Sequence, residues 1–248
     1  MYNPATFTLS DMTECGVALR KLGTGADSME EVADRIVNYF YDQFIDLSNG
    51  ASAFTLVRFF KTHPFGDLPR DLQIYAQTML NQQAVPPATK CLTLLATQGD
   101  RVEWRSRQTS VGHQAIPLIS EQLVAQSPMI SQLIAQFELP IHAVLDPDPT
   151  LIVDLEQKTF NVFHVLDAVN SPYVPAQQEF VVPLEVRSVL GFGGMLPSGN
   201  LIAIIVFSKV PISRETADMF KTLALNVKLA VLPFDRGAVF DQQLLISH

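Results

Sequence analysis

The chain has 248 residues, of which 48% are hydrophobic, so it is long enough to bury a sizeable core and too apolar to be disordered. Seventeen Lys and Arg residues against 25 Asp and Glu residues give a net charge of -8, which argues against nucleic acid or an anionic membrane as the main partner. No apolar stretch approaches the ~18 residues of a membrane span. The first residues lack the basic start and apolar centre of a secretory signal, so we expect a cytoplasmic protein.

Residues 1–50 are predicted to form a helical extension. The residues before Ser10 have no periodic pattern and are expected to be an ill-ordered arm, and Ser10 is a candidate cap for a short helix that Gly23 ends. A stronger helix follows, because Ser28 and Glu31 form the S-x-x-E capping box and apolar side chains then recur at helical spacing. These apolar residues are Met29, Val32, Ala33, Ile36, Val37, Phe40 and Phe44.

Strands and helices are both predicted in the middle of the chain. Residues 51–61 are rich in Phe, Val and Thr, as strands are, and residues 71–80 are predicted to be helical. A further strand is predicted around Cys91, with residues 102–107 as its hairpin partner across the Gly99-Asp100 turn signal. Two helices are then expected to begin at capping residues. These caps are Ser120 and Ser127-Pro128.

The next segments are short. Apolar stretches at 141–145 and 151–155 flank a proline-rich loop at 146–149, and a strand is expected at 161–165. Residues 167–178 contain the Asn, Ser, Pro and Gln typical of a long surface loop. Long loops in compact domains are often functional.

Residues 186–234 contain the clearest pattern in the chain, two apolar strands joined by a Pro-Ser-Gly-Asn turn and followed by an amphipathic helix. The second strand, at 201–207, is apolar on both faces, which is typical of a central strand that is covered on each side. Ser213 is a candidate helix cap, and Glu215 lies where the helix dipole favours a negative charge. The apolar face of this helix consists of Phe220, Leu223, Ala224, Val227 and Val231.

Three glycines interrupt the first of these strands. Gly191, Gly193 and Gly194 are predicted to be backbone requirements of the hairpin, because glycine inside a strand indicates a bulge or the close approach of another group. A phosphate-binding loop is the alternative, but that loop ends in Lys-Ser/Thr and leads into a helix, whereas these glycines lead into another strand. Replacing Gly193 by valine should therefore lower the melting temperature by several degrees.

The order of these elements predicts an α+β fold with an antiparallel sheet, and it resembles the GAF fold, a sheet-and-helix sensor module of bacterial signalling proteins. More specifically, the chain resembles the GAF-like segment at the N-terminus of many bacterial, notably cyanobacterial, PAS and histidine-kinase proteins. The similarity covers roughly residues 51–234. The stretches that carry it are KCLTLLA (90–96), PMISQLI (128–134), NVFHV (161–165), EFVVP (179–183), RSVLGFGG (187–194) and ISRETAD (212–218).

The resemblance implies a GAF-like antiparallel sheet flanked by helices, with inserted helices and terminal helices. It divides the chain into a helical extension at 1–50, a sensor domain at 51–234, and a tail or linker at 235–248. It implies a non-catalytic signal-input domain that senses a small molecule or cofactor and relays the change to an effector such as a histidine kinase or cyclase. A homodimer through the terminal helices is expected from the same resemblance, which supplies no ligand, cofactor or catalytic residue.

The densest polar and aromatic group lies near Trp104. Arginine recognises carboxylates or phosphates bidentately, so this group is either a site for an anionic small ligand or a solvated hairpin face. His164, between two apolar residues, is either a haem or metal ligand or a hydrogen-bonded core histidine. No histidines share a helix at metal-binding spacing, so no metal site is predicted. The predicted lining is Trp104, Arg105, Arg107, His113, His142 and His164.

The two cysteines provide the alternative function. Cys15 and Cys91 have no Cys-x-x-Cys spacing, and a buried, inert thiol is one interpretation of Cys91. Methionine sulfoxide reductases with a GAF fold exist, so a small redox enzyme with Cys91 as the attacking thiol is the other interpretation, although that reaction normally needs more than one cysteine. Hydrolysis is not predicted, because no G-x-S-x-G occurs and the prolines beside Asp146 and Asp148 indicate a turn.

Overall fold

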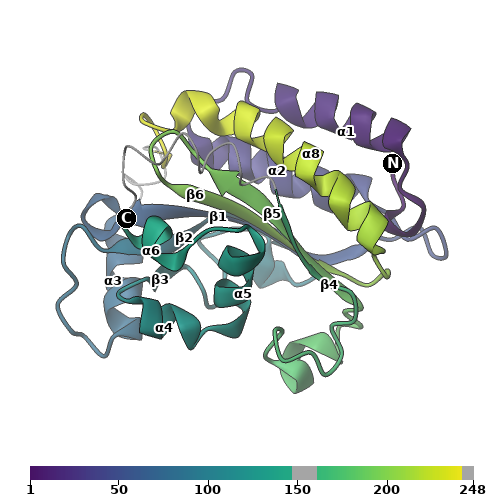
Figure 1. The fold of residues 1–248 in the computed structure, drawn as a ribbon. Helices are drawn as coiled ribbons and strands as arrows, with labels where there is room; N and C mark the ends of the chain where they lie inside the picture. Colours follow the sequence, from purple (N-terminus) through teal and green to yellow (C-terminus); the bar gives the residue numbers. More distant parts are fainter. Residues whose placement is uncertain (147–160, 242–248) are drawn as a thin grey trace.

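The computed structural model describes residues 1–146 and 161–241. Six antiparallel strands form one sheet in the order β3-β2-β1-β6-β5-β4, with helices on both faces (Figure 1), so the predicted α+β class is confirmed. The strands are β1 (Phe54–Pro64), β2 (Lys90–Gly99), β3 (Ala115–Pro117), β4 (Val162–Val165), β5 (Ser188–Met195) and β6 (Leu201–Ser208). The helices are α1 (Leu9–Lys21), α2 (Met29–Gln43), α3 (Arg70–Met79), α4 (Glu121–Ala125), α5 (Pro128–Gln136), α6 (Ile141–Leu145) and α8 (Arg214–Val231).

Strands β5 and β6 form the predicted hairpin, and every residue of both strands is buried. Strand β6 also pairs with β1, so it lies near the centre of the sheet, as its apolar sequence predicted. The turn between the strands places Gly199 at a φ of 77°, a left-handed conformation that glycine adopts without strain. The hairpin is therefore the framework on which both layers of helices pack.

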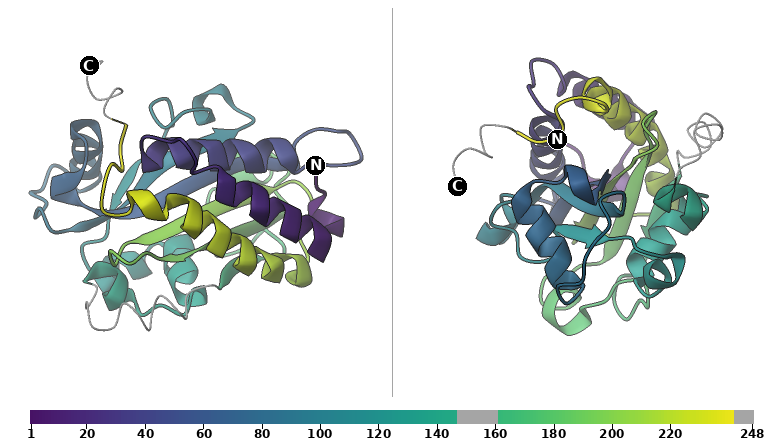
Figure 2. Two further views of the ribbon diagram at one scale, coloured as in Figure 1. Left: turned by 90° about the horizontal axis from the view of Figure 1, so that it is seen from above. Right: turned by 90° about the vertical axis from the view of Figure 1, so that its left-hand side faces the viewer.

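Helices α1, α2 and α8 cover one face of the sheet (Figure 2). Helix α2 lies over β1 and β2, helix α8 lies over β4 and β5, and α1 packs against α8. Ser28 and Ser213 cap α2 and α8 as predicted, because each side chain accepts a backbone N–H three residues later at 3.1 Å. The predicted apolar faces of both helices are fully buried.

The inserted helices α4, α5 and α6 cover the opposite face, together with a π-helical turn at Gln177–Val181. Ser120 caps α4, and α5 begins at Pro128, as predicted. The expected loop at 167–178 consists of turns that lead into the π-helical turn. The predicted apolar segment 151–155 and residues 147–149 of the preceding loop lie outside the described residues.

The prediction of an ill-ordered N-terminal arm is wrong. Tyr2 and Phe7 are buried, their rings pack edge-on at 5.7 Å, and both contact the ring of Phe44 on the sheet side of α2. Helix α1 is capped by Thr8 in a capping box, not by Ser10. The arm is ordered by tertiary aromatic contacts, which have no period in the local sequence.

Residues 102–107 are not the predicted hairpin partner of β2. A 3₁₀ turn forms at Val102–Trp104, and the partner strand is β3. In a strand, Val102 and Trp104 would point to the same face, but Val102 is 72% exposed and Trp104 is 6% exposed. Residues 101–114, called the edge segment below, leave the end of β2 and return to its middle, where the N–H of Leu94 donates to the carbonyl of Gln114.

Residues 235–241, called the C-terminal segment below, fold back from α8 onto the start of α2. The backbone N–H groups of Met29 and Glu30 donate to the carbonyls of Ala238 and Val239 at 2.9 and 2.8 Å. The first N–H groups of a helix have no partner within the helix, so these bonds complete the N-terminus of α2. The C-terminal segment therefore belongs to the folded unit.

The predicted boundaries at residues 50 and 234 stay a prediction. Helices α1 and α2 share one apolar cluster with the sheet and α8. The predicted tail is described only as far as Asp241, and its apolar residues Leu244 and Leu245 lie outside the described part.

Candidate functional site

The edge segment contains four of the six residues that were predicted to line a site. Trp104 packs in the core, where its ring meets Phe180 edge-on at 5.7 Å. The guanidinium carbon of Arg101 lies over the same ring, 4.8 Å from its centroid. Arg105, the next residue, is exposed. Trp104 therefore anchors the edge segment to the sheet, whereas Arg105 lies on the surface.

Arg107 joins the edge segment to two helices through two ion pairs, of which the one with Glu30 is buried. Its Nε donates to Glu30 Oε1 on α2 at 2.7 Å, and Nη1 donates to Asp71 Oδ2 on α3 at 3.1 Å. The side chains of Arg107 and Glu30 are only 5% and 7% exposed, whereas Asp71 is 56% exposed. Glu30 Oε2 also accepts the backbone N–H of Asp241 at 3.0 Å. Glu30, Asp71, Arg107 and Asp241, called the Arg107 junction below, thus connect the edge segment with the C-terminal segment.

A pocket of about 180 Å³ opens beside the Arg107 junction. Its polar lining is mainly acidic, with Glu31 and Asp34 of α2 next to Glu30. Burial and then the charge of Glu30 raise the pKa of the Asp34 carboxyl. Arg107 is the single cation of this lining. The carboxylates of Glu30 and Asp71 in the Arg107 junction balance its positive charge.

The three predicted histidines do not meet. His113 is exposed, although desolvation of its ring and the charge of Arg58 lower its imidazole pKa, and its backbone N–H donates to Tyr75 Oη at 2.7 Å. His142 is exposed on α6. His164 Nε2 lies 2.9 Å from the carbonyl oxygen of Ile212 before α8, on the opposite face from Trp104. The six predicted residues therefore do not form one site. The edge segment contains four of them, whereas His142 lies on α6 and His164 lies on β4.

Arg58 on β1 is a buried cation that the sequence reasoning missed. It is 7% exposed, its Nη2 lies 3.3 Å from Ser110 Oγ of the edge segment, and its Nε has no hydrogen-bond partner. Thr97 on β2 is the residue directly opposite Arg58, and its Oγ1 is also buried without a partner. Burial lowers the pKa of Arg58 to about 10. The one available signal was an arginine among the apolar residues of the strand predicted at 51–61, because a charged side chain is seldom buried without a partner.

A second buried cation, Lys61, lies on the face that α2 and α8 cover, two residues from Phe59, which packs there. Its Nζ lies 3.0 Å from Nδ1 of His63. Burial and the positive charges of Lys61 and Lys90 lower the pKa of His63 to about 3, so this imidazole is neutral at pH 7. The ring of Phe240, from the C-terminal segment, covers His63 edge-on at 5.2 Å.

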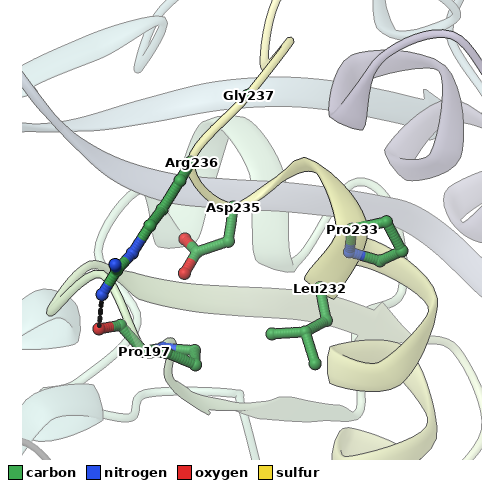
Figure 3. A pocket seen from close by; sticks show the side chains of 6 residues that line it. All are labelled: Pro197, Leu232, Pro233, Asp235, Arg236 and Gly237. Atoms are coloured by element: carbon green, nitrogen blue, oxygen red, sulfur yellow. Dashed lines mark hydrogen bonds between the residues drawn. The ribbon is translucent and has the colours of Figure 1, made fainter.

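The larger pocket, of about 350 Å³, lies where the C-terminal segment meets the β5–β6 turn (Figure 3). Arg236 Nη2 donates to the carbonyl of Pro197 at 3.2 Å, as the dashed line in Figure 3 marks. Asp235 accepts both the backbone N–H and the hydroxyl of Ser198, at 2.9 and 2.6 Å. The polar groups of this pocket are engaged in docking the C-terminal segment on the central hairpin.

Lys61 should give the stability of the protein a specific pH dependence. Burial lowers the pKa of Lys61 from its ordinary 10.5 to about 8 in the folded protein. Between pH 8 and 10.5 the unfolded chain then binds more protons than the folded chain, so this group makes the free energy of unfolding rise with pH, by up to ~1.4 kcal/mol per pH unit. Below pH 8 both states are protonated and the contribution is constant and unfavourable.

Urea unfolding of the wild type and Lys61→Met at a series of pH values measures this contribution. The variant should be the more stable protein at pH 7, and its advantage should shrink as the pH rises from 8 to 10.5. The comparison cancels the titration of the other groups that ionise in this range. An advantage that stays constant up to pH 10.5 would show that Lys61 is not a buried, protonated amine at pH 7.

Both thiols lie inside the protein. Cys15 and Cys91 are fully buried, and burial raises the pKa of each to about 12. Cys15 belongs to the cluster of α1, α2 and α8, whereas Cys91 packs against α3. Among residues 1–146 and 161–241, no three His, Cys, Asp or Glu side chains are placed to hold a metal ion. No helix in those ranges is long and apolar enough to cross a membrane.

Comparisons with known proteins identify similar folds. No family model and no curated protein matches the sequence. A free methionine-R-sulfoxide reductase from Neisseria meningitidis is 11% identical, with a TM-score of 0.47 over 91% of this chain and 93% of that chain. The GAF domain of an Acinetobacter phosphoenolpyruvate-protein phosphotransferase is 12% identical, with a TM-score of 0.45 over 95% and 100%. The phycocyanobilin-bound GAF domain of a cyanobacterial phytochrome is 10% identical, with a TM-score of 0.41 over 98% and 100%.

At these identities the similarity concerns the fold alone. The structure itself has the antiparallel sheet with helices on both faces that the sequence resemblance predicted. What this chain binds or does depends on its own residues.

Proposed function

We propose that the chain is a non-catalytic signal-input domain. In this proposal a small molecule binds where the edge segment meets the sheet, and the Arg107 junction relays the change to α2 and the C-terminal segment. The observation that carries it is the double contact of Glu30, whose two carboxylate oxygens accept from Arg107 Nε and from the backbone N–H of Asp241. A displacement of the edge segment would change both contacts, because a buried carboxylate that loses its cation must find new partners.

The relay would act on the terminal elements, and an effector such as a histidine kinase or cyclase would respond to it. We also propose the homodimer through the terminal helices and a cytoplasmic setting. The support for the dimer is an apolar stripe on the outer side of α8 and the turn that follows it, where Leu225, Leu229 and Leu232 are 42%, 41% and 37% exposed. A specific dimer would bury about 1,200–2,000 Å² in total. Light scattering at tens of micromolar should give the dimer mass, and a monomer mass would contradict this part of the proposal.

The redox enzyme that uses Cys91 is the alternative. A reactive thiol needs a low pKa and access to solvent, and the full burial of Cys91 with its raised pKa supports the non-catalytic function instead. The test is incubation of the wild type and Cys91→Ser with free methionine sulfoxide and dithiothreitol. We expect no turnover above the buffer blank for either protein. Turnover by the wild type that is lost in Cys91→Ser would establish the enzyme and contradict the proposal.

A further inference from the structure

Arg58 carries a positive charge that no carboxylate of residues 1–146 or 161–241 balances. Neither an ion pair nor an acidic side chain near Arg58 occurs in the part of the chain that the structure describes. The other buried arginine, Arg107, has two carboxylates within 3.1 Å. Taking an unpaired guanidinium out of water is costly, and it remains protonated in proteins because its pKa is so high. A bound anion is what would make this burial favourable.

The unused donors of Arg58 and its neighbour lie on one side of the sheet. Arg58 and Thr97 are paired across β1 and β2, so their side chains project from the same face, which is also the face of Leu56 and Phe60. Both Arg58 Nε and Thr97 Oγ1 are buried and have no partner. Buried polar atoms without partners are rare in native proteins and call for a missing water or ion. Here two such atoms occur, and they belong to Arg58 and Thr97, which lie directly opposite each other on β1 and β2.

The geometry of these donors indicates the chemical class of the ligand. The guanidinium edge formed by Nε and Nη2 matches two oxygens of a carboxylate-like group. Within the described residues, Nη2 has a single contact, at 3.3 Å to Ser110 Oγ. A threonine hydroxyl beside that edge can donate to one of the same oxygens. A water molecule could satisfy the two atoms, but it would leave the charge unbalanced. One uncompensated positive charge calls for one negative charge.

We propose that Arg58 and Thr97 bind a small monovalent oxyanion, namely a carboxylate, bicarbonate or nitrate group. The inference rests on the proposed input function, because this oxyanion would be the charged group of the small molecule that the domain detects. Ser110 of the edge segment completes the site, so occupancy would hold the edge segment against β2. Ser110 is three residues from Arg107 in the sequence, so the oxyanion site and the Arg107 junction share the edge segment.

Thermal unfolding of the full chain tests the class of ligand. It is measured in sodium acetate, bicarbonate, nitrate, phosphate or chloride at equal ionic strength and at pH ~8.5, where phosphate is mostly divalent. At least one of the three monovalent oxyanions should raise the melting temperature above that in chloride, and phosphate should do so less, since one guanidinium balances only one charge. Thr97→Val keeps the shape of the side chain and should weaken the binding about tenfold. Arg105→Gln removes an exposed arginine of the edge segment and should leave it unchanged.

A second variant, Arg58→Met, tests the site even if Thr97→Val changes the binding too little to measure. Arg58→Met should unfold at a higher temperature than the wild type in chloride, because it removes an unpaired buried charge, and it should gain nothing from the oxyanions. The wild type should therefore overtake it as the oxyanion concentration rises. Equal shifts in Arg58→Met and wild type, tighter binding of phosphate, or no shift in any oxyanion would each overturn the proposal.

The same samples test the oxyanion site and the relay through the Arg107 junction independently of each other. In ¹⁵N-labelled protein the Nε–H signal of Arg58, assigned by its absence from Arg58→Met, should move during titration with the oxyanion. If that signal moves but hydrogen exchange in the C-terminal segment stays the same, the oxyanion site stands and the proposed relay fails. If the signal does not move for any oxyanion, the site fails and the relay is judged from other ligands.

Discussion

Gly193→Val is expected to cause the largest loss of stability of any single substitution in the central hairpin. A Cβ at Gly193 would lie 2.1 Å from the carbonyl oxygen of Ile202 and 2.9 Å from the Cα of Ala203, both on the neighbouring strand β6. These are backbone atoms of a central strand, so they cannot move aside as the end of a side chain can. We expect a cost of at least about 3 kcal/mol, which for a chain of this size is a fall of roughly 6–12 °C in melting temperature.

Two other glycines make the prediction specific. At Gly191 the added Cβ would meet the tip of the Leu133 side chain at 2.7 Å, so Gly191→Ala should cost less, because that tip can rotate. At Gly237 no atom lies within 4 Å, and Gly237→Ala is the matched control with no expected loss. Calorimetry of the three variants decides the order. A melting temperature of Gly193→Val within 2 °C of the wild type would contradict the register of β5 and β6.

Arg107→Met is expected to destabilise the protein by about 3–5 kcal/mol, because it leaves the buried carboxylate of Glu30 without its cation. The control is Arg214→Ala, which removes an exposed i, i+4 ion pair with Asp218 and should cost at most about 0.5 kcal/mol. Urea denaturation at pH 7 measures both free energies of unfolding.

The double variant Glu30→Met/Arg107→Met should be more stable than the sum of the two single losses predicts, because it removes both charges. Simple additivity of the two single losses would mean that the two side chains do not interact, which would remove the physical basis of the Arg107 junction.

The sequence predicted elements whose pattern is local. The caps Ser28 and Ser213 and the apolar faces behind them follow the helical period, and residues 201–207 are apolar on both faces, so each is found at its expected place. Gly191 and Gly193 of β5 could be assigned as backbone requirements for a similar reason, because glycine inside a strand has few explanations. The order of these elements predicted the antiparallel sheet with helices on both faces.

The contacts that define the candidate site could not be predicted in this way. Glu30 occupies a position in the first turn of a helix where an acidic residue is ordinary, and only the folded chain brings Arg107 and Asp241 to its two oxygens. Arg58 lies in a segment whose composition predicts a framework strand, and nothing in the local sequence shows that its Nε is buried without a partner. The tight packing of Tyr2 has no repeat in the sequence either, since it depends on aromatic rings more than 40 residues away.

Hydrogen exchange of the full chain, followed by mass spectrometry, tests the input function most directly. A panel of amino acids, keto acids, nucleotides and inorganic oxyanions is first ranked by the rise in melting temperature, and exchange is measured with and without the best compound. The account predicts slower exchange in the edge segment and also in the first turn of α2 and in the C-terminal segment, with the distant effect lost in Arg107→Met. A panel without effect on the melting temperature, or protection confined to the edge segment in the wild type, would contradict it.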